Sequence, residues 1–265
     1  MARSPAVWDP AQYLQFAGER LRPALHLLAQ VPLEAPARVV DLGCGPGNVT
    51  AILRQRFPSA EVTGVDGSAA MLEKARATVE QCRFEQADFF RWQPPAPLDL
   101  IYSNAALHWV DRHPLLFPRL LSFLAPGGVL AVQMPDMYDT PLRQIPCGLA
   151  AMEPWSEHLA GVTSAPGILP AAEYWDLLSP HVASLDLWRT TYIHALSGEN
   201  AVMEWAAGSS LRAFLDRLPE ARRAAFQQAY SDAAQSHYPR RADGTTLLAF
   251  HRLFIVARGS EARST

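Results

Sequence analysis

Between residues 38 and 134 the chain alternates short apolar runs with helical segments, and this alternation constrains the fold more than any other feature. The β-branched and apolar runs predict strands over 38–42, 60–66, 82–88, 98–104 and 129–134. Helices are expected over 47–57, 68–81 and 114–125, with a turn at Pro126-Gly127-Gly128. Because short connections join these elements, the pattern predicts a parallel sheet with right-handed crossovers and helices on both faces.

The regular alternation ends at Pro135, and the rest of the chain has a different character. Helices and loops are expected over 135–180, a strand over 184–196, helices over 198–237 and a final strand over 245–258. We therefore expect an α/β fold that is Rossmann-like and doubly wound, with a mostly parallel seven-stranded sheet and a helical cap over the C-terminal edge of its strands. The expected parts are an N-terminal helical lid (1–35), a ligand-binding core (36–134), a cap that binds substrate and includes strand 184–196 (135–244), the final core strand (245–258) and a tail (259–265).

Composition narrows the class of protein further. The chain has 265 residues and a net charge of -3, so no basic surface points to nucleic acid. The N-terminus lacks the apolar region of a signal peptide, and no uncharged run is long enough to span a membrane. The 3 cysteines are widely spaced, which argues against a disulfide framework or a metal site. We expect a cytoplasmic monomer that binds a small molecule and needs no metal, nucleic acid or membrane.

A glycine-rich turn follows the first expected strand. In V-V-D-L-G-C-G-P-G (39–47), glycines stand at Gly43, Gly45 and Gly47. A dinucleotide-binding turn needs G-x-G-x-x-G, and here the third glycine comes one position early. Asp41 stands two positions before the first glycine, where a carboxylate would repel a pyrophosphate but suits a cationic or hydroxyl-bearing ligand. The turn therefore favours a ligand other than a dinucleotide.

Two further carboxylates end the next strands. Asp66 follows the second strand, where it could accept hydrogen bonds from both hydroxyls of a ribose. Asp88, with Phe89 beside it, follows the third, where a carboxylate and a ring could hold an exocyclic amine and stack on a base. One such glycine pattern is weak, and Asp at a strand end is usually a turn former. Three features at successive strand ends together indicate one binding site.

These motifs, with V-D-G-S (65–68), A-D-F-F (87–90) and L-A-P-G-G-V-L (124–130), resemble the class I (seven-stranded) S-adenosylmethionine-dependent methyltransferases. The resemblance covers about residues 36–134 and the last strand. It implies that S-adenosylmethionine is the cofactor and that Asp41 lies near its methionine amino group. The residues implied to bind the cofactor are Asp41, Gly43, Gly45, Gly47, Asp66, Gly67, Ser68, Met71, Asp88, Phe89 and Asn104.

The methyl acceptor must be sought outside the cofactor half, because this fold serves many acceptors. No N/D-P-P-Y/F/W motif of nucleic-acid amino methylases follows the fourth strand, and no carboxylate cluster suggests a metal-assisted catechol site. Cationic and aromatic side chains of the second half are the remaining feature. Arg212, beside Gly208-Ser209-Ser210 at an expected helix start, is the favoured anion-binding residue. The other candidate substrate-binding residues are Arg189, Arg143, His108, Trp109, Tyr192 and Trp8.

A second likeness spans nearly the whole chain. The segments W-D-P-A-Q-Y-L-Q-F (8–16), W-R-T-T-Y-I-H (188–194) and R-L-F-I-V-A (252–257) are similar to those methyltransferases that esterify a carboxylate of a small tricarboxylic acid, trans-aconitate. The likeness implies a monomethyl ester and S-adenosylhomocysteine as products. Such an acceptor is ionised at neutral pH and needs no general base, so no catalytic side chain is expected.

Alternative interpretations remain open from the residues alone. The chain could methylate an oxygen, nitrogen or carbon of a neutral metabolite, or bind the cofactor without turnover. Trp8, Tyr13 and Phe16 could close over the site as a lid, although packing of an amphipathic helix (11–30) explains them equally well. Trp109 could wall the acceptor or simply pack against the core.

Overall fold

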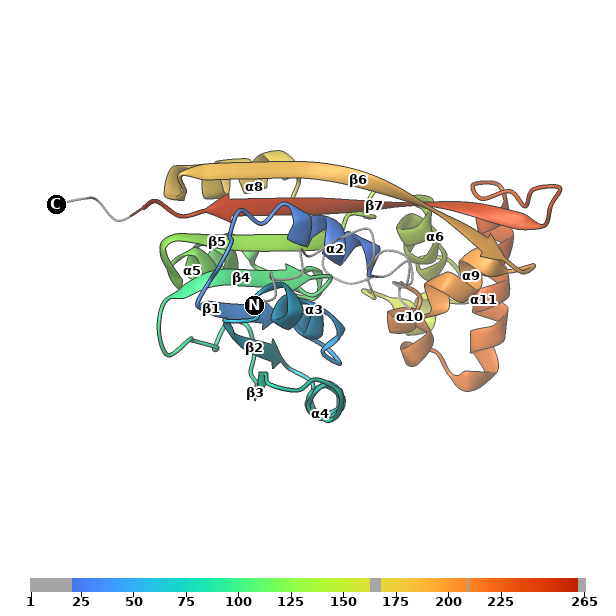
Figure 1. Ribbon diagram of the computed structural model, residues 1–265. Coiled ribbons are helices and arrows are strands. Elements are labelled where there is room, and N and C mark those ends of the chain that lie inside the picture. The colour runs from blue at the N-terminus through green and yellow to red at the C-terminus, as the bar shows by residue number, and fades with distance from the viewer. Residues whose placement is uncertain (1–20, 163–167, 209, 262–265) are drawn as a thin grey trace. The chain divides into compact units, whose positions relative to one another are not determined.

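A computed structural model describes residues 21–162, 168–208 and 210–261 (Figure 1). The strands are β1 (Arg38–Leu42), β2 (Glu61–Asp66), β3 (Arg83–Gln86), β4 (Leu98–Asn104), β5 (Leu124–Pro135), β6 (Ser184–Ser197) and β7 (Thr245–Arg258). The helices are α2 (Arg22–Ala29), α3 (Asn48–Arg56), α4 (Ala69–Thr78), α5 (His113–Leu121), α6 (Pro141–Ala150), α7 (Ser156–Leu159), α8 (Ala171–Leu178), α9 (Ala201–Ala207), α10 (Arg212–Arg217) and α11 (Glu220–Gln235). Short 3-10 turns, η1 (Leu107–Trp109) and η2 (Ser179–His181), follow β4 and α8.

The seven strands form one sheet in the order β3-β2-β1-β4-β5-β7-β6. β1 pairs in parallel with both β2 and β4, and parallel pairing continues to β3 and β5. The predicted α/β class and seven-stranded sheet are therefore confirmed. From β1 the sheet extends to β2 and β3 on one side and to β4 and β5 on the other. The carboxyl ends of β1 and β4 therefore border the point where the strand order reverses. Open α/β sheets bind their ligands at this point.

The segment expected to be a turn before the fifth strand lies inside β5 instead. Leu98 pairs with Leu124 and Leu100 pairs with Val129, so β5 accommodates extra residues as a bulge. Gly127 adopts φ +72° within the bulge and donates its N–H to Ser260 O, while Gly259 donates to Gly128 O. These bonds continue the antiparallel pairing of β5 with the end of the chain. The sequence pattern correctly marked an irregularity but not that the strand continues through it.

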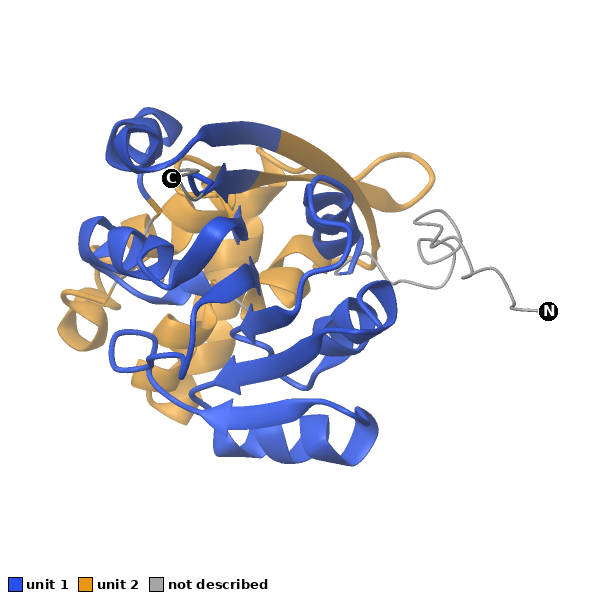
Figure 2. Ribbon diagram, turned by 60° about the vertical axis from the view of Figure 1, so that its left-hand side comes forward, with its two compact units in different colours: residues 1–134, 169–189, 253–265 blue, residues 135–168, 190–252 orange. Residues whose placement is uncertain are grey.

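The chain divides into two compact units (Figure 2). Unit 1 comprises residues 1–134, 169–189 and 253–265 and holds the parallel strands. β1 and β4 are buried over nearly their whole length because helices cover both faces of a parallel sheet. α3 packs against β1 and β2, and α5 packs against α8. The Tyr102 hydroxyl on β4 donates a hydrogen bond to Ala24 O of α2, at 2.5 Å.

Unit 2 comprises residues 135–168 and 190–252. Its core joins α6, α7 and the helices that follow β6, with Phe226 of α11 at the centre. The Phe226 ring packs edge-on against Trp155 at 5.3 Å and stacks on Phe214 at 6.0 Å between ring centroids. The helical character expected over 198–237 is confirmed as α9, α10 and α11. No helix of the described ranges is both long and apolar enough to cross a bilayer.

Two expected helix starts are not confirmed: one lies outside the described residues, and the other differs in the structure. Of the helix expected over 11–30, the structure describes only the part that forms α2. The expected start of this helix and the proposed lid residues lie outside the described part of the chain. Ser209 was expected to help open a helix and is also outside it. α10 begins at Arg212, and Leu211 occupies its N-cap position without a side-chain cap. The expectation that Ser210 caps this helix is therefore wrong.

Candidate active site

Two neighbouring cavities lie in unit 1 at the carboxyl ends of the parallel strands. The larger has a volume of about 510 Å³ and the smaller about 220 Å³. Gly43, Gly45 and Pro46 line both, so the glycine-rich turn forms a wall shared by the two cavities. The side chains and backbone that otherwise line the larger cavity belong to Asp66, Gly67, Met71, Ala87, Asp88, Phe89, Ala105, Ala106, Trp109 and Val110. The smaller is completed by Leu21, Asp41, Cys44, Asn48, Val49 and Asn104.

The glycines of the turn make a close approach of two backbone segments possible. A Cβ atom on Gly43 would lie 2.1 Å from the Cβ of Ala106, and Gly43 adopts φ +82°. A side chain at Gly43 would therefore push the turn away from the segment after β4. Gly45 adopts φ +53°, and a Cβ there would meet nothing within 4 Å among the described atoms. The absence of a side chain at Gly45 leaves its backbone open to both cavities.

Asp41 is the buried charge of the smaller cavity. Its side chain is 1% exposed, and Thr50 Oγ1 donates a 2.7 Å hydrogen bond to Oδ2. Burial raises the pKa of Asp41 from 3.8 to about 7; the Thr50 hydrogen bond opposes this shift, while the nearby Asp66 charge adds to it. Within the described residues, neither Asp41 Oδ1 nor the buried Asn104 Oδ1 has a hydrogen-bond partner. These two acceptors would suit the N–H donors of a cationic group.

Asp66 lies at the end of β2, where backbone amides fix its carboxylate. Gly45 N–H donates to Oδ2 at 2.9 Å, and Ser68 N–H donates to Oδ1 at 2.8 Å. Each carboxylate oxygen can accept a further bond. The carboxylate is thus oriented before any ligand arrives, with capacity left for a pair of hydroxyls.

The far side of the larger cavity combines a carboxylate with apolar walls. Asp88 follows β3, and its Oδ1 accepts a 2.9 Å bond from Phe90 N–H. Phe89, Met71 and Trp109 line the same cavity, and Trp109 is 57% exposed. A flat aromatic ligand could lie between such apolar groups and still bond to the carboxylate.

Most residues predicted from the glycine turn and the strand ends therefore come together. Gly47 and Ser68 line neither cavity. A Cβ on Gly47 would lie 2.8 Å from Val79 Cγ2 at the end of α4, so this glycine serves helix packing. Ser68 caps α4, as its place at the start of the expected helix indicates, because its side chain accepts a hydrogen bond from Met71 N–H.

The sequence interpretation missed two contributors to this site. Thr50 lies nine residues after Asp41, in the first turn of the following helix, and this position is the signal that it could reach the carboxylate. Ala106 was overlooked because nothing in its residue type indicates that Gly43 requires a small neighbour.

The predicted acceptor-binding residues lie in contrasting environments. Arg212 is 77% exposed and lies 3.7 Å from Asp216 on the same helix, as a solvated pair does. Arg143 on α6 is half-buried, and burial lowers the pKa of its guanidinium. Arg189 is exposed on β6, whereas Tyr192 on the same strand is buried. Trp8 lies outside the described residues.

His108 directly precedes Trp109, which lines the larger cavity. It is buried within η1, and its ring packs on Trp109 with 4.7 Å between centroids. Arg252 of β7 was not considered from the sequence, although it is buried and lies over the Phe250 ring at 4.8 Å. The signal for it is a His-Arg pair inside the otherwise apolar run 247–257.

Comparison with known proteins agrees with this geometry. Residues 39–128 match the model of a methyltransferase domain family. The solved YcgJ protein of Bacillus subtilis has a TM-score of 0.56 at 16% identity, over 90% of this chain and 98% of that one. A phosphoethanolamine N-methyltransferase of Haemonchus contortus, solved with S-adenosylhomocysteine, has a TM-score of 0.56 at 14% identity, over 95% of this chain and 57% of its own. The fold and the site define an S-adenosylmethionine-dependent methyltransferase.

Sequence relatives narrow the family. A trans-aconitate 2-methyltransferase of Paracidovorax citrulli is 50% identical over 96% of this chain and 98% of its own. Proteins of the same name from Methylobacterium radiotolerans and Yersinia pestis are 49% and 48% identical, over 96% and 94% of this chain and 98% and 97% of theirs. The chain belongs to the trans-aconitate 2-methyltransferase family. The predicted class, cofactor and family resemblance are confirmed.

The residues present fit this cofactor. Unpartnered buried oxygens at Asp41 and Asn104 border the smaller cavity, and the oriented Asp66 carboxylate borders the larger. Over the residues that can be placed, no group of three or more His, Cys, Asp or Glu side chains could hold a metal ion.

Proposed function

We propose that this protein transfers a methyl group from S-adenosylmethionine to a carboxylate of trans-aconitate, giving a monomethyl ester and S-adenosylhomocysteine. The observation that carries the proposal is the near-complete coverage by relatives of that name at about half identity, together with the two strand-end cavities. We further propose that the protein acts in the cytoplasm, because its three free cysteines suit a reducing compartment, and that it acts as a monomer.

The donor is proposed to span both cavities. Asp41 would accept from the ammonium of the methionine moiety beside Asn104, and Asp66 would accept from the ribose hydroxyls. Asp88 would accept from the adenine amine, with Phe89 and Met71 against the base. When bound, the sulfonium supplies an electrophilic methyl group. The backbone at Gly43 and Gly45, which carries no side chain, would shield the bound donor from water on one side.

The acceptor places different demands on the protein. A carboxylate is ionised at neutral pH, so the chain has to orient it and neutralise its neighbours rather than remove a proton. Arginines should hold the carboxylates that do not react and leave the reacting one free, since a paired carboxylate is a weaker nucleophile. Among Arg143, Arg189 and Arg212, burial favours Arg143, because a partly desolvated guanidinium binds an anion more strongly than a solvated one.

Other predicted contributions remain part of the proposal. His108 and Trp109 would wall the acceptor beside the larger cavity, with Tyr192 contributing from β6. Residues 1–35, including Trp8, would act as a lid, and residues 135–244 would supply the acceptor-binding side chains.

The test is mass spectrometry of products formed from S-adenosylmethionine and a panel of acids. The panel contains trans-aconitate, cis-aconitate, isocitrate and citrate, with the trimethyl ester of trans-aconitate as a neutral control. We expect a product 14 mass units heavier chiefly from trans-aconitate, as one methyl replaces one proton. Formation of S-adenosylhomocysteine with neutral metabolites but not with the acids would support the alternative acceptor class and contradict this proposal.

A further inference from the structure

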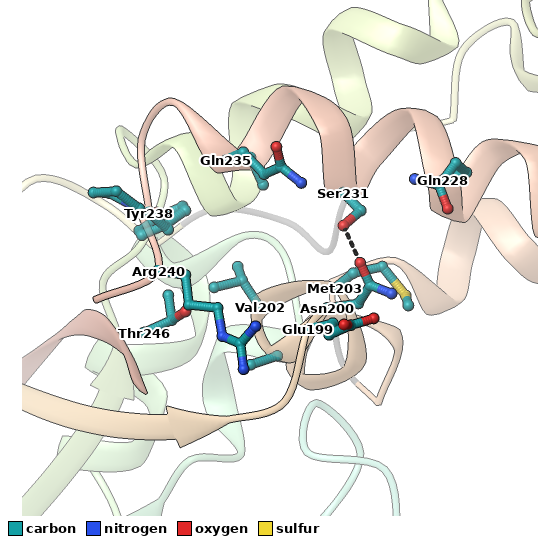
Figure 3. A pocket seen from close by; sticks show the side chains of 13 residues that line it. Glu199, Asn200, Val202, Met203, Gln228, Ser231, Gln235, Tyr238, Arg240 and Thr246 are labelled. Atoms are coloured by element: carbon teal, nitrogen blue, oxygen red, sulfur yellow. Dashed lines mark hydrogen bonds between the residues drawn. The ribbon is translucent and has the colours of Figure 1, made fainter. Parts of the chain in front are cut away.

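Unit 2 contains a cavity of its own, with a volume of about 610 Å³. It lies where the start of α9, the face of α11 and the first residues of β7 meet, and all its lining residues belong to unit 2 (Figure 3). None of these residues lines the two cavities of the donor site. The proposed methyl transfer gives this cavity no role.

The walls of this cavity are polar and partly preorganised. Ser231 of α11 is buried, and its hydroxyl donates a 2.6 Å hydrogen bond to Asn200 Oδ1 (Figure 3). This bond fixes the Asn200 carboxamide and leaves its N–H₂ group as a donor. Thr246 is also buried, and Gln235 adds a second carboxamide from α11. The hydroxyls here are buried, while the carboxamides of Asn200 (half-buried) and Gln235 (exposed) keep donors and acceptors that a polar ligand could use.

Two opposite charges border the cavity. Arg240 extends toward the Glu199–Asn200 turn in Figure 3, and its Nε donates to Gly244 O at 3.2 Å. The guanidinium has further N–H donors beyond that one. Among the residues with described positions, neither Arg240 nor Glu199 forms an ion pair. The cavity therefore offers one cation and one carboxylate to a ligand.

We propose that this cavity is a second ligand site that binds a small zwitterion, an α-amino acid or a close analogue. Its carboxylate would bind Arg240, and its ammonium would bind Glu199. A simple anion would meet the Glu199 charge, and a simple cation would meet the Arg240 charge. A neutral ligand would form neither charge-assisted hydrogen bond. The carboxamides of Asn200 and Gln235, which both donate and accept, would contact the side chain of the ligand.

The experiment must separate this site from the donor site, because S-adenosylmethionine itself ends in an amino acid. Isothermal titration calorimetry is run on the intact protein saturated with S-adenosylhomocysteine, against the twenty common L-amino acids. The best binder is then compared with its N-acetyl form, which lacks the ammonium, and with its carboxamide, which lacks the carboxylate. We expect at least one amino acid to bind with a Kd below about 10 mM and both derivatives to bind about tenfold more weakly or worse.

Matched variants locate the binding. Arg240→Gln and Glu199→Gln should each weaken binding about tenfold, because each removes one charge-assisted contact. Arg241→Gln and Glu220→Gln are exposed residues of the same unit that do not line the cavity, and they should leave the Kd unchanged. If none of the amino acids binds with a Kd below about 10 mM, the proposal is overturned. Equal binding of either derivative, or binding that both cavity variants leave intact, would overturn it as well.

Discussion

The donor site of unit 1 and the polar cavity of unit 2 are built by different means. Backbone geometry shapes the donor site: Gly43 allows a close approach to Ala106, and two main-chain amides hold the Asp66 carboxylate. Side chains on helices and loops shape the other cavity, where Arg240 and Glu199 are exposed. A site set by the backbone cannot be adjusted at one position without moving its neighbours. A site set by side chains can gain or lose one contact at a time.

The largest effect is expected at Gly43. Replacing Gly43 with Ala forces a Cβ into contact with Ala106 and strains a residue at φ +82°. We expect Gly43→Ala to lower the free energy of unfolding by about 3 kcal/mol or more, measured by urea denaturation. Gly148→Ala is the matched control, because a Cβ there meets nothing within 4 Å among the described atoms and the residue lies within α6. The control should be neutral or stabilising by up to about 1 kcal/mol.

A substitution in the cavity of unit 2 should affect stability much less than Gly43→Ala does. Gln235→Ala should change the free energy of unfolding by no more than about 0.5 kcal/mol, because this side chain is exposed. If Gly43→Ala costs as little as Gln235→Ala, the distinction between a backbone-shaped and a side-chain-shaped site is wrong.

Asp41→Asn should produce the next largest effect. The variant keeps the shape of the side chain and removes the charge proposed to bind the methionine ammonium. We expect the Kd for S-adenosylhomocysteine to rise about 100-fold by calorimetry at pH 8. Glu73→Gln, at an exposed position of α4, should leave that Kd unchanged. An Asp41→Asn protein that binds the product normally would remove Asp41 from the donor site.

The variant should also be more stable than the native protein when no ligand is present. The pKa of Asp41 is raised by burial, so the folded protein holds this proton more tightly than the unfolded chain. As pH rises from about 4 through about 7, ionisation of Asp41 therefore removes stability, and the cost is fully present at pH 8. Asn at this position avoids that cost. A lower free energy of unfolding for the variant at pH 8 would contradict this assignment.

Donor affinity should depend on pH through the same group. Below about pH 7 Asp41 is protonated in the free protein and must release its proton to pair with an ammonium. We expect the affinity for S-adenosylhomocysteine to fall by up to about tenfold per pH unit below pH 7 and to level off above it. Calorimetry at pH 7 in buffers of different ionisation enthalpy should show net proton release. Asp41→Asn should lose both effects, and a pH dependence that survives in the variant would assign them to another group.

The smallest effects concern Arg143 and Arg212, two of the arginines of unit 2. Arg143→Gln should raise the KM for trans-aconitate about tenfold, because a half-buried guanidinium is the stronger partner for a carboxylate. Arg212→Gln should change KM by about twofold at most, since its side chain is 77% exposed. kcat should stay close to the native value in both. The reverse order of effects would favour the residue indicated by the sequence over the one indicated by burial.

Much of the donor site could be predicted from the sequence because it depends on local rules. β1 and β4 have the predicted bounds, since each is a buried apolar run that ends at a turn or a polar residue. The three carboxylates lie near or just after the carboxyl ends of strands whose parallel direction the alternation with helices predicts. Gly47 and Ser68 show the limit of this reasoning, because a motif does not reveal which of its residues face the ligand and which pack a helix.

Other features depend on contacts between distant residues and could not be read in this way. The bulge at Gly127 exists because β5 pairs with the end of the chain. The raised pKa of Asp41 follows from burial, which no residue type encodes. The place of Arg212 beside a glycine and two serines indicates an anion site, but its exposure depends on how α10 lies in the fold, which no residue type reveals.

The most direct measurement is a crystal structure of the protein grown with S-adenosylhomocysteine. The account predicts electron density for the adenosine beside Asp66 and Asp88, continuous with an amino acid moiety beside Asp41 and Asn104. Density for the ligand at any other place on the chain, or an amino group turned away from Asp41, would contradict it.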